Sequence, residues 1–185
     1  GNIVGTVKTW FSNRRVRSEL RYKLGLADSL YIEYHENGVI RSEGEYKLGV
    51  KVDVWKLYHE NGMISNFGAY TNNEKSGNWQ YFNTSGKLVA EGKFQLGIES
   101  GQWFYYHDNG SLSSIGNYTL GKKNGLWGNF HKNGLPKQDE TWRNDKLMTV
   151  SAFTTIDGDE LEVGQLNNGQ GTRITYYEDG VKYSE

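Results

Sequence analysis

Aromatic and aliphatic side chains recur along this chain at a fixed spacing of 24 residues, with polar residues and glycine between them. Relative to a glycine that closes each regular copy, aromatic residues stand seven and four positions before it and eight positions after it. Positions two, four, six and eight after this glycine share one face of an extended strand, because side chains alternate with a period of two. The pattern therefore predicts strands rather than helices.

Two kinds of turn separate the predicted strands. The first ends in Asn-Gly or Asp-Gly in most copies, and such pairs are the strongest short signal of a hairpin because both residues favour positive φ. The second falls at the segments KLG, QLG and TLG. Each 24-residue copy thus predicts a two-stranded hairpin, closed by one of the anchor glycines Gly38, Gly62, Gly86, Gly110, Gly134 and Gly158.

Successive hairpins predict an all-β fold, a single-layer antiparallel meander of about seven β-hairpin repeats. Because neighbouring strands lie about 4.8 Å apart, each repeat adds roughly 10 Å and the sheet is expected to be elongated. We expect one domain over residues 1–185, with regular repeats at about 14–135, a degenerate repeat at 136–158 and a C-terminal repeat at 159–185.

A second glycine stands six positions after the anchor, in the middle of a strand where glycine normally weakens pairing. The neighbouring strand carries a Trp or Tyr in every regular copy, and we expect its ring to lie over the bare glycine backbone. The core is then built from aromatic rings and glycine rather than from aliphatic side chains. Its expected members are Trp55, Trp79, Trp103, Trp127, Gly44, Gly68, Gly92 and Gly116.

One copy shows a recognisable motif. Residues 92–110, GKFQLGIESGQWFYYHDNG, follow a pattern that resembles the variant MORN repeat, which also builds the bacterial YwqK-like antitoxins. The resemblance covers about residues 14–135 and, more loosely, 159–185, whereas the copy at 137–158 has Ser151 at the Trp position. It implies a non-enzymatic module that binds another protein, in bacteria often a toxin. The repeat consensus is scaffold, so no contact residue is transferred with it.

Composition narrows the class of protein. A net charge of -1 with 14% aromatic residues is unlike a disordered chain, and this balance argues against a nucleic-acid partner. The absence of cysteine excludes disulfides and thiolate sites. No apolar stretch approaches the roughly 18 residues of a membrane span, so no transmembrane segment is expected. The compartment stays open between the cytoplasm and, if a signal was removed, the periplasm or cell surface.

All four histidines occupy one repeat position, three before the anchor glycine. Equivalent positions in adjacent copies are two strands apart, about 10 Å, whereas zinc ligands lie about 2 Å from the metal. We therefore expect hydrogen bonds at the entry to each turn rather than a metal site. These residues are His35, His59, His107 and His131.

Other catalytic or cofactor motifs are incomplete. The acidic run at 157–162 lacks the spacing of a calcium loop, and Gln170 stands where a phosphate loop after Gly164 and Gly169 requires Lys. No nucleophile elbow occurs. We expect no enzyme activity, no catalytic residue, no metal and no cofactor.

Two groups of residues remain as candidates for binding a partner. Aromatic side chains outside the core registers cluster on adjacent strands and predict either packing and dimerisation or an exposed patch for a protein or sugar. Residues 1–24 carry six cations against Glu19, and residues 139–185 carry ten acids against four cations. The basic end predicts either a solvated surface or the steering of an acidic partner or lipid headgroup. The candidates are Tyr81, Phe104, Tyr105, Arg14, Arg15, Arg17 and Arg21.

We therefore expect a non-enzymatic repeat scaffold for protein–protein interaction, with an antitoxin or immunity protein that binds a toxin as the form the resemblance implies. The alternative is a cell-envelope or surface protein that binds glycan, cell wall or a membrane surface through its aromatic strips. Exposed edge strands at the ends of the sheet also allow a homodimer.

Overall fold

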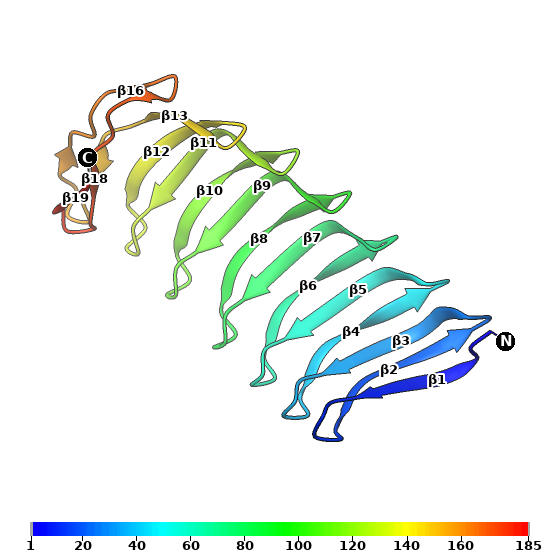
Figure 1. The fold of residues 1–185 in the computed structure, drawn as a ribbon. Helices are drawn as coiled ribbons and strands as arrows, with labels where there is room; N and C mark the ends of the chain where they lie inside the picture. Colours follow the sequence, from blue (N-terminus) through cyan, green and yellow to red (C-terminus); the bar gives the residue numbers. More distant parts are fainter. Residues whose placement is uncertain (1, 185) are drawn as a thin grey trace. The chain divides into compact units, whose positions relative to one another are not determined.

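The computed structural model describes residues 2–184, which form strands and turns and no helix. Thirteen strands make one antiparallel sheet in which the order of strands follows the order of the chain, as the meander prediction requires. Figure 1 shows the successive hairpins. The strands are β1 (Gly5–Trp10), β2 (Val16–Lys23), β3 (Leu26–Tyr34), β4 (Ile40–Lys47), β5 (Val50–Tyr58), β6 (Ile64–Thr71), β7 (Glu74–Phe82), β8 (Leu88–Gln95), β9 (Ile98–Tyr106), β10 (Leu112–Thr119), β11 (Lys122–Phe130), β12 (Pro136–Arg143) and β13 (Lys146–Val150).

The chain divides into two compact units, and each is described by itself. Unit 1 comprises Gly1–Leu88 and Phe94–Ile98, and unit 2 comprises Val89–Lys93 and Glu99–Glu185.

The two kinds of turn lie at opposite edges of the sheet in each unit (Figure 1). In the Asn-Gly turn, the Gly38 N–H donates to the His35 carbonyl at 2.9 Å, and Gly38 has a φ of 90°. In the second kind, both central residues have positive φ, 50° at Leu48 and 86° at Gly49. Two successive positive φ values define the turn whose twist matches that of the flanking strands.

Three regular hairpins contain a bulge just before their core Trp. In the pairing of β6 with β7, Gly68 pairs with Trp79, and the residue after Gly68 pairs with Ser76. Two residues of β7, Gly77 and Asn78, are therefore left out of the ladder, and Gly77 has a φ of 66°. The same shift occurs between β4 and β5 and between β10 and β11. Because a bulge bends the strand that carries it, these strands curve around the aromatic side chain that follows.

Tryptophan rings and glycine backbone pack together in the regular part of the sheet. The four expected tryptophans are between 0% and 4% exposed. The glycine opposite each ring leaves the space that the ring fills, because a Cβ atom there would overlap the ring. The pairs are Gly44 with Trp55, Gly68 with Trp79, Gly92 with Trp103 and Gly116 with Trp127.

A lysine covers three of these rings. The ammonium nitrogen of Lys51 lies 4.0 Å from the ring centroid of Trp55, and Lys75 and Lys123 lie 4.2 Å from their rings. Burial lowers the pKa of Lys51, and the nearby Glu33 carboxylate opposes that shift. Cation–π contact and the lysine stem together screen the tryptophans from water.

The large sheet ends at Val150, and residues 151–184 fold into three separate two-stranded sheets. Glu140 stands in the register of the core glycines, and Ser151 stands in the register of the core tryptophans. Without the ring and the bare backbone that receives it, the next hairpin has no core contact to extend the sheet. The short strands are β14 (Phe153–Thr154), β15 (Glu160–Leu161), β16 (Leu166–Asn167), β17 (Gln170–Gly171), β18 (Thr175–Tyr176) and β19 (Lys182–Ser184).

Candidate functional site

The four predicted arginines are exposed in unit 1 but do not form one site. Arg14 and Arg15 lie in the first turn, where the Arg15 guanidinium donates to the Glu36 carbonyl at 2.9 Å. Arg17 and Arg21 lie four residues apart on β2 and therefore share a face of the strand. The guanidinium of Arg17 lies 5.9 Å from the Phe11 ring centroid. The basic end is thus a charged surface spread over a turn and one strand face.

The predicted aromatic cluster is also divided. In unit 2, Tyr105 stacks on Trp103 with ring centroids 6.1 Å apart, so it belongs to the aromatic face of the sheet. Phe104 is its neighbour in the same strand and points to the opposite face. In unit 1, Tyr81 lies 6.3 Å from Trp79 and accepts a hydrogen bond from Lys75 at 2.9 Å. Both tyrosines therefore extend the aromatic core of their own unit.

The histidines form the turn-entry hydrogen bonds that their register predicts. Each Nε2 lies 2.6–2.9 Å from a carbonyl oxygen of the following copy, and since a carbonyl only accepts, Nε2 carries the proton. An asparagine two residues later donates to the same copy, as Asn37 does to the Glu60 carbonyl at 2.8 Å. No group of three or more His, Cys, Asp or Glu side chains among residues 2–184 could hold a metal ion. Within the same range, no helix could cross a membrane.

Two tyrosines of the regular sheet are paired with carboxylates. The Tyr58 hydroxyl donates to Glu43 at 2.7 Å, and the Tyr106 hydroxyl donates to Glu91 at 2.7 Å. Burial, reinforced by the hydrogen bond to the carboxylate, raises the pKa of each tyrosine to about 12. The tyrosines stay protonated and act as hydrogen-bond donors that tie neighbouring strands together.

Four leucines stand in an unfavourable backbone conformation on exposed turns. Leu24, Leu48 and Leu96 in unit 1 and Leu120 in unit 2 have φ values of 50–52° and are 66–79% exposed. A side chain with a Cβ in the left-handed region costs roughly 1–2 kcal/mol, and asparagine tolerates it better than leucine. Three other copies have asparagine at this position, Asn72, Asn144 and Asn168.

In unit 1 these leucines lie along one edge. Each turn is bonded to the preceding copy, as the Gly25 N–H donates to the Ile3 carbonyl, Gly49 to Ala27 and Gly97 to Lys75, all within 3.0 Å. Exposed aliphatic side chains flank the turns. We call this set the leucine-turn edge: Leu24, Leu26, Leu48, Leu96 and Ile98.

The leucine-turn edge is absent from the candidates that the sequence supplied. The pattern is visible in the sequence, because the position two residues after the third aromatic register is leucine in some copies and asparagine in others. The sequence does not reveal that these leucines have positive φ, a backbone conformation that is unfavourable for leucine.

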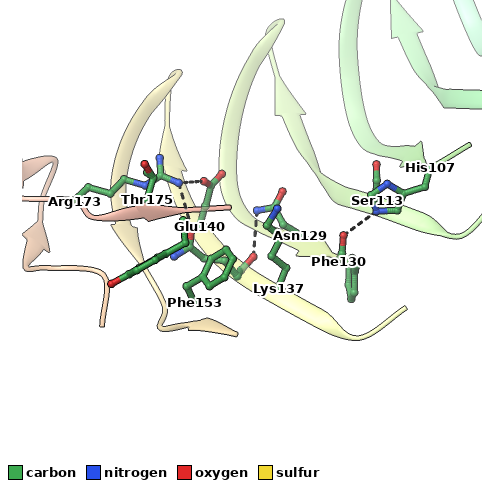
Figure 2. Close-up of a pocket in the computed structure, with 11 residues that line it drawn as sticks. His107, Ser113, Asn129, Phe130, Lys137, Glu140, Phe153, Arg173 and Thr175 are labelled. Carbon is green, nitrogen blue, oxygen red and sulfur yellow. Dashed lines mark hydrogen bonds and ion pairs between the residues drawn. The ribbon is translucent and has the colours of Figure 1, made fainter. Parts of the chain in front are cut away.

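Unit 2 contains a pocket of about 300 Å³ between the end of the large sheet and the C-terminal segment. Figure 2 shows Glu140 of β12 facing Arg173, whose Nη2 lies 2.7 Å from the Glu140 carboxylate. Asn129 and Gln138 line it from the sheet, and Phe153 and Tyr176 from the C-terminal hairpins. The pocket combines charged, amide and aromatic groups.

Solved structures that resemble this chain include two complexes with UDP and a sugar ligand, both of low similarity. The GtfA/B complex bound to UDP and GlcNAc is 13% identical with a TM-score of 0.23, covering 58% of this chain and 21% of that chain. A mutant of S. aureus TarM in complex with fondaparinux, α-GlcNAc-glycerol and UDP is 11% identical with a TM-score of 0.21, covering 78% and 21%. The chain spans about a fifth of each of these chains, and similarity at this level supports no inference about it.

Comparison with curated protein sequences finds no match. Two segments of the chain, residues 28–48 and 99–119, match the family model described as MORN repeat variant. Repeats of this kind commonly serve as scaffolds for protein or membrane interaction and are generally not enzymes. In these segments the chain is similar to the MORN repeat variant.

Proposed function

We propose that the chain is a non-enzymatic scaffold that binds another protein through the leucine-turn edge of unit 1. One observation carries the proposal: leucine occupies exposed left-handed positions where other copies of the same repeat carry asparagine. Folding alone favours asparagine there, so the leucines are retained for a contact that the isolated chain does not make.

The surroundings of the leucines indicate the chemistry of the partner. Exposed Lys23 and Lys47 directly precede Leu24 and Leu48 in the turns. Equivalent turns are two strands apart, roughly 10 Å, so an elongated partner surface could receive several leucines at once. We expect apolar pockets rimmed by acidic side chains on the partner, because apolar anchors and complementary rim charges are typical of specific interfaces.

The more specific proposal is that this partner is a toxin and that the chain acts as its antitoxin or immunity protein. It is supported by the resemblance to the MORN variant of the YwqK-like antitoxins. The alternative, glycan binding along the aromatic strips, would need accessible tryptophans, and the four core rings are at most 4% exposed.

The proposal is tested by replacing the leucines with the residue that the other copies carry. A triple variant with Leu24→Asn, Leu48→Asn and Leu96→Asn should keep or exceed the wild-type midpoint of urea unfolding. Affinity purification of the full chain from its host, with mass spectrometry, should recover one stoichiometric protein with the wild type and not with the triple variant.

The matched control replaces exposed apolar residues outside the turns, Leu30→Asn and Val54→Asn, which are 54% and 55% exposed in unit 1. This variant should retain the partner. Retention by the triple variant at wild-type level would refute the leucine-turn edge as the contact surface. If the recovered partner does not inhibit growth when it is expressed alone, the toxin proposal is refuted and the proposal of a protein-binding scaffold stands.

A further inference from the structure

The pocket of unit 2 lies where the repeat pattern breaks. We call the copy that contains Asn129, Glu140 and Ser151 the pocket copy. Twenty-four residues earlier, the preceding copy has two large aromatic residues and a glycine at the same repeat positions. Residues of the C-terminal hairpins line the pocket together with residues of the sheet, and its volume is about 300 Å³. The replacements are Asn129 for Tyr105, Glu140 for Gly116 and Ser151 for Trp127.

The carboxylate in the pocket wall is already satisfied. One oxygen of Glu140 accepts from Arg173 Nη2 at 2.7 Å, and the other accepts from Trp142 Nε1 at 3.0 Å. The amide of Gln138 is also engaged, since its oxygen accepts from Arg173 at 3.3 Å and its nitrogen donates to the Ser151 carbonyl at 3.1 Å. These groups hold the wall in place and offer little acceptor capacity to a ligand.

Two cationic side chains of the pocket have hydrogen-bond donors that no described acceptor of the protein satisfies. Arg173 Nε is buried and has no hydrogen-bond partner among residues 2–184. Lys137 makes no ion pair within the described chain, and its ammonium nitrogen lies 5.7 Å from the Phe153 ring centroid. A buried N–H without an acceptor is costly unless a ligand satisfies it. Since Arg173 neutralises Glu140, Lys137 leaves the pocket lining with a net positive charge, and this charge together with the unpaired Arg173 Nε–H favours a ligand that carries a negative charge.

The rest of the lining indicates what carries that charge. Phe130, Phe153 and Tyr176 supply aromatic surface to the lining, and Ser113 supplies a hydroxyl group. The Thr175 hydroxyl also lies in the lining but is hydrogen-bonded to the Ser184 hydroxyl at 2.6 Å. Figure 2 shows Phe153, Lys137 and Arg173 among these residues. The volume is at the small end of ligand pockets, which range from about 300 to 1,000 Å³. Aromatic surface next to hydroxyl and amide groups suits the two faces of a hydroxylated ring.

We propose that this pocket binds a small acidic sugar, a hydroxylated ring with a carboxylate that Lys137 and Arg173 Nε contact. The site lies in unit 2 and does not rest on the proposed contact through the leucine-turn edge of unit 1. It also differs from glycan binding along the tryptophan strips, because the core tryptophans take no part in it.

The proposal is tested by titrating the full ¹⁵N-labelled chain with glucuronate and following the indole N–H of Trp142, which is bonded to the pocket carboxylate. Glucose, acetate and inorganic phosphate serve as comparison ligands. We expect saturable shifts with glucuronate, and affinities for the other three that are weaker by about tenfold or more, because one charge-assisted hydrogen bond changes a binding constant by roughly that factor.

Three variants separate binding from folding. Lys137→Gln should weaken glucuronate binding about tenfold, and Arg173→Lys should weaken it similarly while keeping a cation beside Glu140. Lys132→Gln, an exposed lysine outside the pocket, should bind like the wild type. The proposal is overturned if glucuronate leaves Trp142 and its neighbours unshifted, if phosphate or glucose binds as tightly, or if both pocket variants bind like the wild type in their folded state.

Discussion

The regular hairpins and the C-terminal segment carry the same turn glycines, yet only the first group forms the large sheet. Gly158 and Gly180 close turns with the same hydrogen-bonding pattern as Gly38, and all three have φ values between 83° and 98°. The C-terminal strands nevertheless have only two or three residues and pair only within their own hairpins.

The two regions differ in the contact between a tryptophan ring and the backbone of a core glycine. In the regular copies a tryptophan fits over the backbone of a core glycine, and a lysine covers three of the four rings. In the pocket copy Glu140 and Ser151 replace the glycine and the ring. Turn chemistry therefore determines where the chain reverses, and the ring-on-glycine contact determines whether successive hairpins join.

The largest expected effect comes from filling the gap beneath a ring. Gly116→Ala places a Cβ inside the Trp127 ring and should lower the free energy of unfolding by about 3 kcal/mol, the upper range for overpacking. Gly128→Ala is the matched control on the paired strand, because its added Cβ would meet atoms no closer than 3.4 Å. Urea unfolding of both variants tests the contrast, and equal losses would show that the ring contact is not decisive.

A smaller and local effect is expected in the C-terminal segment. Arg173→Ala removes the 2.7 Å ion pair to Glu140 and should weaken the attachment of residues 151–184 by about 1–2 kcal/mol. Amide hydrogen exchange should accelerate in that segment and stay slow in β9–β11. Arg143→Ala, an exposed cation on the same strand as Glu140, is the control. If amide exchange accelerates throughout unit 2, residues 151–184 do not open independently of the sheet and the prediction is wrong.

The smallest effect concerns pH and belongs to the regular sheet. The pKa of Tyr58 and of Tyr106 rises from 10.0 to about 12 on folding. The folded chain therefore holds two protons that the unfolded chain releases, so this stabilisation is complete below pH 10 and is lost as the pH rises from about 10 to about 12. Urea midpoints measured across that window should fall with pH.

The variant with Tyr58→Phe and Tyr106→Phe should show a shallower fall across the same window. Tyr183→Phe, an exposed residue of the C-terminal segment, serves as the control. A double variant with the wild-type slope would indicate that other groups cause the alkaline loss.

Much of the fold was predictable because its determinants are close in sequence or on the next strand. The Asn-Gly turns, the ring over glycine and the histidine hydrogen bonds each involve one hairpin and its neighbour. The pocket was not predictable, since Arg173 meets Glu140 across 33 residues after the periodic pattern has stopped. The leucine-turn edge was missed for another reason, because only the backbone conformation shows that Leu48 stands where asparagine would be favoured.

The histidine hydrogen bonds affect how such a chain folds and how it can gain or lose whole repeats. Each joins residues 23 apart, so the bonds connect a copy only to the next one. Such low contact order allows folding to begin in any hairpin and to spread by zipping. Duplication or loss of 24 residues would leave the other contacts intact. Glu140 and Ser151 then act as a two-residue stop signal, and the length of the sheet depends on where that signal falls.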